Sequence, residues 1–218
     1  SSHFGSSSTR ATVAQQASRN RKRTRKYLRM WRFAQLGMSD EGSDEEVYTG
    51  IESFDDLGLD GQLLRGIYAY GFETLSKFQK RSISPIIRGR DVFGQGQSGM
   101  GKTAAYVIGL LQRVDVRRAA CQGVILVPTR ELAASLTHVI VQLGDYLGVR
   151  CHACIGGRSM RDDIDLLRRG DTHIVVCTPG RLCELMFRRR CFTVDDVIVC
   201  VLDEADEVMQ RGFKEQIF

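Results

Sequence analysis

The feature that most constrains the fold of this chain is a glycine-rich run that fits the pattern G-x-x-x-x-G-K-[ST]. The run consists of Gly96, Gln97, Ser98, Gly99, Met100, Gly101, Lys102 and Thr103. In this pattern the backbone N–H groups cradle phosphates, the lysine reaches the β- and γ-phosphate oxygens, and the final hydroxyl reaches Mg²⁺. Such a loop leaves a strand and opens a helix, whose N-terminus adds its positive end to the cradle. The run therefore predicts a strand at 91–93 and a helix from Lys102.

Apolar runs alternate with amphipathic stretches along the chain from Ser53 onward. Continuous runs of Val, Ile, Leu and Cys suit strands that are covered on both faces, and a βαβα order implies right-handed crossovers. We therefore expect an α/β fold with a doubly wound parallel sheet, whose ligand loops lie at the carboxyl ends of the strands. The predicted strands are Asp91 to Phe93, Gly123 to Val127, Val149 to Ile155, His173 to Cys177 and Val197 to Leu202. The predicted helices are Lys102 to Val114, Glu131 to Leu147 and Met160 to Arg169.

A cluster of acids, Asp203-Glu204-Ala205-Asp206, directly follows the last predicted strand. Asp203 would emerge beside the phosphate loop, where it can hold Mg²⁺ directly or through water. Glu204 would lie next to it, where it can orient and deprotonate an attacking water. The alternative is an acid cluster that only stabilises a helix N-terminus through the helix dipole. Together with the phosphate loop, the cluster favours an ATP-handling enzyme with Lys102, Asp203 and Glu204 as catalytic residues and with Thr103 and Asp203 as metal ligands.

The charges are unevenly distributed along the chain. Nine Lys or Arg residues and no acid lie between Arg10 and Arg32, whereas nine acids and no base lie between Asp40 and Asp60. We expect residues 1–48 to form a disordered tail and residues 49–218 to form one domain. The basic run suits a solvated tail, a nuclear import signal or a non-specific RNA contact. Because the nine positive charges and the nine negative charges of residues 1–60 cancel, the whole net charge of +5 belongs to residues 61–218. A positively charged domain is what a nucleic-acid partner would favour.

The cysteines and the hydropathy indicate a reducing compartment. The seven cysteines are odd in number and scattered through apolar segments, unlike a secreted disulfide framework. Cys151 and Cys154 have C-x-x-C spacing, but a strand would direct the two sulfurs to opposite faces, which disfavours a metal site. No apolar stretch approaches the roughly 20 residues that span a bilayer, and the polar N-terminus lacks the apolar region of a secretory signal. We therefore expect a cytoplasmic or nuclear protein with no membrane partner.

Two further segments follow predicted strands and carry an arginine among residues suited to turns. They are Pro128-Thr129-Arg130-Glu131-Leu132-Ala133 and Thr178-Pro179-Gly180-Arg181. Backbone amides and arginine side chains at such a rim grip phosphates without reading bases. The alternatives are a plain turn, in which Pro179 starts a helix, and a surface pair between Arg130 and Glu131.

These two segments and the acid cluster, with Gly156-Gly157 between the first two, resemble motifs Ia, GG, Ib and II of the DEAD-box RNA helicases. Upstream, Phe54 and the segment Gly71 to Gln79 resemble the Q motif, whose glutamine reads adenine and whose aromatic ring stacks on it. The segments Ser53 to Leu59 and Leu63 to Glu73 are similar to the translation initiation factor 4A group. The sequence departs from the family at packing or loop positions, so the resemblance implies that ATP binding is retained. These positions are Leu75, Phe78, Met100 and Cys177, where proline, isoleucine, threonine and glycine are usual.

The resemblance implies a RecA-like P-loop NTPase domain that uses ATP and Mg²⁺. The implied function is that of an ATP-dependent RNA helicase, which couples RNA-stimulated ATP hydrolysis to local unwinding of an RNA duplex. The alternative is an ATP-gated RNA clamp or a protein scaffold, with partners in a translation or RNA-processing complex. The nucleotide-binding residues would be Phe54, Gln79 and the loop from Gly96 to Thr103. The RNA-binding residues would be Pro128, Thr129, Arg130, Gly157, Thr178, Gly180 and Arg181.

The resemblance covers residues 52–218, which correspond to the ATP-binding half of a family member. The family places a Ser-Ala-Thr motif and a second RecA-like domain, with its arginine fingers, after the acid cluster. An arginine finger is worth ~10³ to 10⁵ in the rate of phosphoryl transfer. We therefore expect this chain to be nearly inactive by itself.

Overall fold

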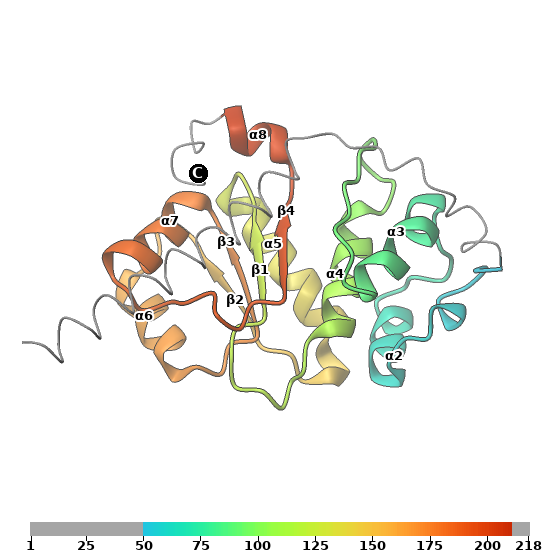
Figure 1. The fold of residues 1–218 in the computed structure, drawn as a ribbon, viewed down its shortest axis with the longest axis horizontal. Helices are drawn as coiled ribbons and strands as arrows, with labels where there is room; N and C mark the ends of the chain where they lie inside the picture. Colours follow the sequence, from blue (N-terminus) through green and yellow to red (C-terminus); the bar gives the residue numbers. More distant parts are fainter. Residues whose placement is uncertain (1–49, 211–218) are drawn as a thin grey trace, which may run out of the picture. The chain divides into compact units, whose positions relative to one another are not determined.

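The computed structural model describes residues 50–210 (Figure 1). The predicted disordered tail, residues 1–48, lies outside these residues, as does the chain from residue 211 onward. Within residues 50–210, no helix combines the length and the hydrophobicity needed to cross a membrane.

The described residues form short parallel strands connected by helices. The strands are β1 (Gly123–Leu126), β2 (Cys151–Cys154), β3 (Ile174–Cys177) and β4 (Val199–Leu202). The α-helices are α2 (Gly61–Ala69), α3 (Lys77–Ile87), α4 (Lys102–Arg113), α5 (Arg130–Leu143), α6 (Met160–Arg169), α7 (Pro179–Cys183) and α8 (Ala205–Gln210). Two 3₁₀ turns, η2 (Asp55–Leu57) and η3 (Asp145–Leu147), and a π-helical turn, η4 (Glu184–Arg188), complete the order.

The strands form one parallel sheet in the order β2-β3-β1-β4. β1 is central, and its Gly123 is paired with Ile174 of β3 on one side and with Val199 of β4 on the other. Ile125 of β1 belongs to the main core cluster, whereas its neighbour Val124, on the opposite face, is also buried. Both faces of the sheet are therefore covered, which confirms the predicted doubly wound α/β fold.

One predicted strand does not form among the described residues. Residues 91–93 have no strand structure, and the side chains of Val92 and Phe93 are 43% and 75% exposed. A strand needs an adjacent strand edge, and no described strand pairs with the edge of β4 that faces away from β1. A strand of three residues would also form only a few hydrogen bonds with a neighbouring strand, too few to offset the entropy that is lost when its backbone is ordered. The prediction of a strand at Asp91 to Phe93 is therefore wrong.

The other predicted elements are present; the helix predicted from Met160 to Arg169 has the bounds of α6, and the rest have shifted ends. The four remaining strands are confirmed, each shorter than its apolar run. The helix predicted from Glu131 to Leu147 is divided, because α5 ends at Leu143 and Gly144 separates it from η3. The helix that starts at Lys102 is confirmed.

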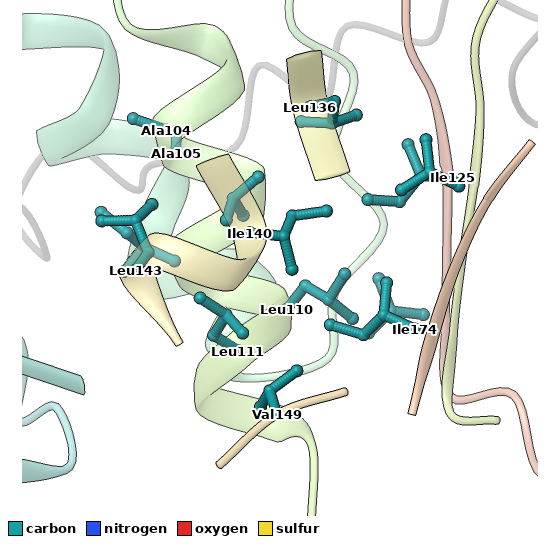
Figure 2. Close-up of a cluster of buried hydrophobic side chains, with 14 of the residues drawn as sticks. Ala104, Ala105, Leu110, Leu111, Ile125, Leu136, Ile140, Leu143, Val149 and Ile174 are labelled. Carbon is teal, nitrogen blue, oxygen red and sulfur yellow. The ribbon is translucent and has the colours of Figure 1, made fainter. Parts of the chain in front are cut away.

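The main core lies between the sheet and the helices α4 and α5 (Figure 2). Leu110 and Leu111 of α4 and Ile140 of α5 are at most 1% exposed, and Ile125 and Ile174 join them from the sheet. Burying a side chain of this size stabilises the fold by about 1.5–3 kcal/mol relative to leaving it exposed. This packing holds α4, and therefore the helix end that follows the phosphate loop, in a fixed position against the sheet.

Candidate nucleotide and RNA site

The phosphate loop leads directly into α4. Gly99 and Gly101 have φ values of 86° and 80°, in the left-handed region that glycine adopts without side-chain strain. Gly101 is the N-cap of α4, so the unpaired N–H groups of the first helical turn lie at the end of the loop. The Lys102 ammonium donates to the carbonyl oxygen of Gly96 across the loop. A glycine loop that ends at a helix N-terminus, with a lysine beside it, is suited to bind phosphate groups.

The two predicted metal ligands, Thr103 and Asp203, meet at the hydroxyl of Tyr106. Tyr106 donates a 2.7 Å hydrogen bond to Oδ2 of Asp203, and its hydroxyl is also hydrogen-bonded to the Thr103 side chain. Burial, and next the charge of Asp203, raise the pKa of Tyr106 far above its ordinary value, so the hydroxyl keeps its proton. Hydroxyl and carboxylate oxygens are ligands that Mg²⁺ accepts. The residues present therefore fit this ion.

Tyr106 is a residue of the site that sequence reasoning missed. It lies three positions after Thr103, and this spacing places both side chains on one face of α4. A tyrosine within the apolar stretch that follows a phosphate loop could have been recognised as a hydrogen-bond donor to a metal-binding acid.

Glu204 follows Asp203 in an unusual backbone conformation. Its φ is 48°, which is uncommon for a residue other than glycine, and its N–H donates to Oδ1 of Asp203 at 3.0 Å. A hydrogen bond with Glu207, then burial and the neighbouring negative charges, raise the pKa of the exposed Glu204 carboxyl. A carboxylate with a raised pKa accepts a proton near neutral pH more readily than an ordinary one.

Gln79 links the start of α3 to the phosphate loop. Its Oε1 accepts from the Ser76 N–H at 2.8 Å, and Ser76 Oγ accepts from the Gln79 N–H at 3.2 Å, so the two residues form a capping box. The Gln79 Nε2 donates to the carbonyl oxygen of Gly101 at 3.4 Å, and Ser76 Oγ donates to that of Met100 at 2.8 Å. Both ends of the Gln79 carboxamide thus have partners within the protein. An adenine contact would use the donor and acceptor capacity that these bonds leave.

Phe54 is completely buried. Its ring is stacked at 6.4 Å from the ring of Phe72 and meets Tyr68 edge to face at 6.3 Å. The structure therefore places Phe54 in an aromatic cluster of the core. An adenine ring could stack on Phe54 only after its aromatic neighbours move.

An open cleft with a volume of about 580 Å³ collects residues from the loops after β1, β2 and β3. Six of the seven predicted RNA-binding residues line it, and only Gly157 does not. The lining also includes two acids and a glycine that were not predicted for this role. The lining residues are Pro128, Thr129, Arg130, Glu131, Gly156, Thr178, Gly180, Arg181 and Glu184.

Arg130 lies over the glycine pair. A Cβ atom on Gly156 would be 3.0 Å from Nη2 of Arg130, and one on Gly157 would be 2.8 Å from Nη1. Gly157 also has a φ of 86°, a backbone conformation that favours glycine there. Thr129 is the N-cap of α5 and accepts from the Leu132 N–H at 3.1 Å, which sets the start of the helix that carries Arg130. Because Arg130 is exposed, its guanidinium can reach a phosphate in the cleft.

Arg181 is buried and points to an acid inside the protein. Its side chain donates from Nε to Oδ2 of Asp163 at 2.8 Å and from Nη2 to the carbonyl oxygen of Arg158 at 2.9 Å. The other carboxylate oxygen of Asp163 is 2.8 Å from Nε2 of His152. Burial by itself would raise the pKa of Asp163, but the hydrogen bonds from His152 and Arg181 hold it below its usual value. Arg181 therefore braces the cleft from within, and its charge is already neutralised.

Sequence reasoning missed His152 and Asp163. Asp163 shares a face of α6 with the buried Leu167, and an acid on the apolar face of an amphipathic helix is the signal that could have found it. His152, Cys154 and Asp163 place ligand atoms within 4.8 Å of one another. We interpret this cluster as part of the ion-pair network, because Asp163 is engaged by Arg181. Cys151, the other half of the C-x-x-C pair, does not belong to it.

β1 joins the phosphate side of the site to the cleft. The Asp203 N–H donates to the carbonyl oxygen of Leu126 at 3.0 Å, and the Val127 N–H donates to that of Cys177 at 3.0 Å. Pro128, the first cleft residue, follows Val127 directly. The first residue after β4 and the first residue after β1 are therefore each hydrogen-bonded to the last residue of the adjacent strand, at the carboxyl end of the sheet.

The sequence of the chain matches a known family over most of its length. The family model for DEAD/DEAH box helicases matches residues 76–218. The chain is 50% identical over 189 residues to the ATP-dependent RNA helicase eIF4A of Pyricularia oryzae, covering 85% of this chain and 47% of that protein. It is 51% identical over 185 residues to the ATP-dependent RNA helicase eIF4A of Schizosaccharomyces pombe, covering 83% and 47%. The chain thus spans about half the length of the curated relatives it matches.

Solved structures agree with this assignment. The fold is similar to that of S. cerevisiae dbp5 bound to gle1 and ip6, with a TM-score of 0.69 and 34% identity, over 76% of this chain and 42% of that one. It is also similar to a DEAD box protein from Methanococcus jannaschii, with a TM-score of 0.71 and 29% identity, over 76% and 45%. These likenesses confirm the RecA-like fold that the family resemblance implied. The chain belongs to the DEAD/DEAH box helicase family, and it is of the eIF4A type.

Proposed function

We propose that this chain is the ATP-binding domain of an ATP-dependent RNA helicase, in which RNA stimulates ATP hydrolysis and an RNA duplex is locally unwound. The observation that carries the proposal is the backbone connection between the two parts of the site. The Asp203 N–H is hydrogen-bonded to Leu126, and the cleft begins two residues later at Pro128. A ligand that moves one of these loops therefore acts on the other through β1.

ATP and Mg²⁺ are the proposed cofactors. Lys102 and the first N–H groups of α4 bind phosphate oxygens, and Thr103 and Asp203 hold the ion directly or through water. When bound, Mg²⁺ neutralises negative charge that develops on the phosphates. Glu204 orients a water and accepts its proton, a role that its raised pKa supports.

Gln79 and Phe54 are the proposed adenine-recognition residues. The Gln79 carboxamide accepts from the Ser76 N–H and donates to the Gly101 carbonyl oxygen at the end of the phosphate loop. Adenine binding at Gln79 would therefore also adjust the phosphate loop. Phe54 takes part only if the aromatic cluster with Phe72 opens. We therefore expect adenine binding to be accompanied by a rearrangement at this cluster.

RNA is the proposed partner of the cleft and binds through its sugar–phosphate backbone. Arg130 supplies an exposed guanidinium, and the loops at Pro128 and Thr178 supply backbone groups at the rim. Contacts of this kind position a strand without reading its sequence. Arg181 acts as a positioning residue, because its guanidinium ties Asp163 of α6 to the loop at Arg158.

ATP turnover with and without single-stranded RNA tests the proposal. The measurement is made on this chain alone and after addition of the family's C-terminal domain in trans. We expect RNA-stimulated turnover only with the added domain, and loss of that turnover in Glu204→Gln with nucleotide binding retained. Turnover that RNA leaves unchanged under both conditions would contradict the helicase and favour an ATPase that remodels protein.

The second candidate is an ATP-gated RNA clamp or scaffold in a translation or RNA-processing complex. It uses the same site, and the structural relative dbp5 was solved with a protein partner, gle1. A long-lived RNA complex with a non-hydrolysable ATP analogue, together with little unwinding by the two-domain protein, would favour this function. We propose a cytoplasmic or nuclear location for either function.

A further inference from the structure

A second basic surface lies at the end of η4. Phe187 is 68% exposed, and three exposed arginines follow it, Arg188, Arg189 and Arg190. The C-terminal turn of α6 contributes two more exposed arginines, Arg168 and Arg169. We call Phe187 to Arg190 with Arg168 and Arg169 the arginine surface.

The two segments of the arginine surface lie near each other in space. The two helices that carry these segments are joined directly, because Nε of Arg181 on α7 donates to Oδ2 of Asp163 on α6 at 2.8 Å. Figure 1 shows α6 and the continuation of α7 on the same side of the sheet. The arginines therefore combine into one region of positive charge.

Most of this charge has no acid partner. Arg189 pairs with Glu184 at 3.3 Å, with Nη2 and Oε1 as the nearest atoms. Within residues 50–210, the other four arginines of the surface form no ion pair. A cluster of uncompensated exposed charges of one sign attracts a polyanion.

The arginine surface is continuous with the cleft. Glu184 lines the cleft, and the same carboxylate pairs with Arg189. The helix that joins them begins at Pro179, beside the cleft residues Thr178 and Gly180, and continues without a break into η4. A strand that lies in the cleft can therefore continue along α7 and η4 to the arginines.

Arg190 adopts a backbone conformation that does not suit it. Its φ is 50°, in the left-handed region where glycine, asparagine and aspartate are the usual residues. An arginine at this position costs backbone energy that glycine would avoid. The conformation favours a role for the side chain other than local folding.

We propose that the arginine surface is a second contact site for single-stranded RNA, which takes up the strand where it leaves the cleft. The arginines bind consecutive phosphates and Phe187 stacks on an unpaired base, a combination that holds single strands without sequence preference. An acidic protein would also be attracted by the arginines, but it would gain less than an unpaired base does from contact with the exposed ring of Phe187. The inference rests on the proposed function, because it extends the same RNA footprint.

Binding of labelled oligouridylate of 6 and 15 nucleotides to the full chain tests the inference. The shorter strand fills the cleft, and the longer one can also reach the arginine surface. For Arg188→Ala/Arg190→Ala we expect unchanged affinity for the 6-mer, roughly 10-fold weaker affinity for the 15-mer, and a salt slope reduced by about 1 to 2. For Phe187→Ala we expect the 15-mer to bind at least about 5-fold more weakly. Arg117→Ala is the matched control, because Arg117 is exposed but already paired with Asp115.

Arg190→Gly separates an RNA contact from a structural role. Glycine relieves the backbone conformation, so we expect an equal or higher melting temperature together with weaker binding of the 15-mer. A purely structural arginine would lower the melting temperature and leave the RNA affinity unchanged.

The outcomes distinguish failure of this inference from failure of the proposed function. If no RNA binds even after the family's C-terminal domain is added in trans, or if Arg130→Ala leaves both affinities unchanged, the proposed function fails and the inference falls with it. If Arg130→Ala weakens both strands but the arginine-surface variants leave the 15-mer affinity and salt slope unchanged, only the inference is overturned. Competition by polyglutamate that equals competition by RNA, with no effect of Phe187→Ala, would overturn it in favour of an acidic protein partner.

Discussion

The hydroxyl of Tyr106 donates to Oδ2 of Asp203 at 2.7 Å, and this contact joins the helix that follows the phosphate loop to the acid proposed to hold Mg²⁺. The two residues belong to different parts of the fold, since Tyr106 is on α4 and Asp203 follows β4. The hydrogen bond holds the Asp203 carboxylate beside α4, the helix that also carries Thr103. Tyr106 is therefore a positioning residue for the metal site.

Tyr106→Phe removes this hydrogen bond and keeps the ring. We expect the free energy of unfolding to fall by about 1 kcal/mol and nucleotide binding in Mg²⁺ to weaken roughly 5-fold, the equivalent of the same energy. Binding in EDTA should change little. Titration of a fluorescent ADP analogue with Mg²⁺ and with EDTA measures the difference. Thr137→Val is the control, because it removes a hydrogen bond to the Ala133 carbonyl oxygen within α5, which is not part of the nucleotide site. Equal Mg²⁺ dependence in Tyr106→Phe and the parent would refute the positioning role.

Asp163→Ala should be one of the most destabilising substitutions in the domain. It leaves the buried Arg181 charge without its acid, and loss of one partner of a buried ion pair costs about 3–5 kcal/mol. Asp165→Asn on the same helix is the control, because Asp165 is exposed and lies 4.0 Å from Arg161; a change within about 0.5 kcal/mol is expected. Urea denaturation measures both. A loss for Asp163→Ala no larger than the control's would show that the network contributes nothing.

The same network predicts a pH dependence of stability. Because the folded-state pKa of Asp163 is below its unfolded value, its ionised form stabilises the fold above a pH of about 3.9, and this stabilisation is lost as the pH falls through the folded value. Asp163→Asn keeps the shape and removes the titration. Its free energy of unfolding should therefore decline less steeply than the parent's below about pH 4. Parallel curves for the two proteins would assign the acid sensitivity to other carboxyl groups.

Two substitutions of Gln79 separate its two hydrogen bonds. Gln79→Glu can still accept from the Ser76 N–H but cannot donate to the Gly101 carbonyl, whereas Gln79→Ala loses both. We expect Gln79→Ala to cost about 1 kcal/mol of stability, and both variants to discriminate less between ATP and GTP, because a site built around an amide rejects the wrong hydrogen-bonding edge. Competition of ATP and GTP against fluorescent ADP measures this. Equal affinities for ATP and GTP in the parent would remove the adenine-reading role.

Lys102→Ala and Glu204→Gln should affect different steps. Lys102→Ala removes a phosphate contact and should weaken ATP binding, whereas Glu204→Gln should bind ATP normally and lose hydrolysis in the protein completed with a second domain. Because the pKa of Glu204 is raised, the acid limb of the pH–rate profile should lie above the range of an ordinary glutamate, and the rate should fall as Glu204 becomes protonated. Hydrolysis by Glu204→Gln at the parental rate would show that another group takes the proton.

The parts of the fold that were predicted correctly depend on neighbours close in sequence. Gly99 and Gly101 supply the loop conformation. The continuous apolar run Gly123–Leu126 indicates a buried strand by its own composition, whichever strands it pairs with. The strand predicted at 91–93 depended instead on a partner edge elsewhere in the chain. A short apolar run therefore indicates strand propensity, but it does not establish that the segment is paired and buried in a sheet.

Motif spacing placed six of the seven predicted RNA-binding residues at one cleft, but it did not give the direction of their side chains. Arg181 lies at the cleft as expected, but its guanidinium turns to Asp163, an acid 18 residues away in sequence. Phe54 was predicted to stack on adenine, but its ring is completely buried beside Phe72, which the folded core brings near. Motif spacing carries no information about such long-range contacts, and this is why the inward direction of both side chains was not foreseen.

The carbonyl oxygen of Leu126 accepts a hydrogen bond from the Asp203 N–H, and the next residue, Val127, donates to the Cys177 carbonyl oxygen. A chain of backbone hydrogen bonds therefore joins the nucleotide site to the cleft. If binding at either end of this chain of bonds changes its geometry, the two ligands are thermodynamically linked. Whatever factor nucleotide applies to RNA affinity, RNA must apply to nucleotide affinity. A tenfold factor corresponds to about 1.4 kcal/mol, which is comparable to the net value of one hydrogen bond, about 0.5–1.5 kcal/mol. The gain or loss of a single backbone bond at the end of β1 is therefore enough to produce cooperativity of that size.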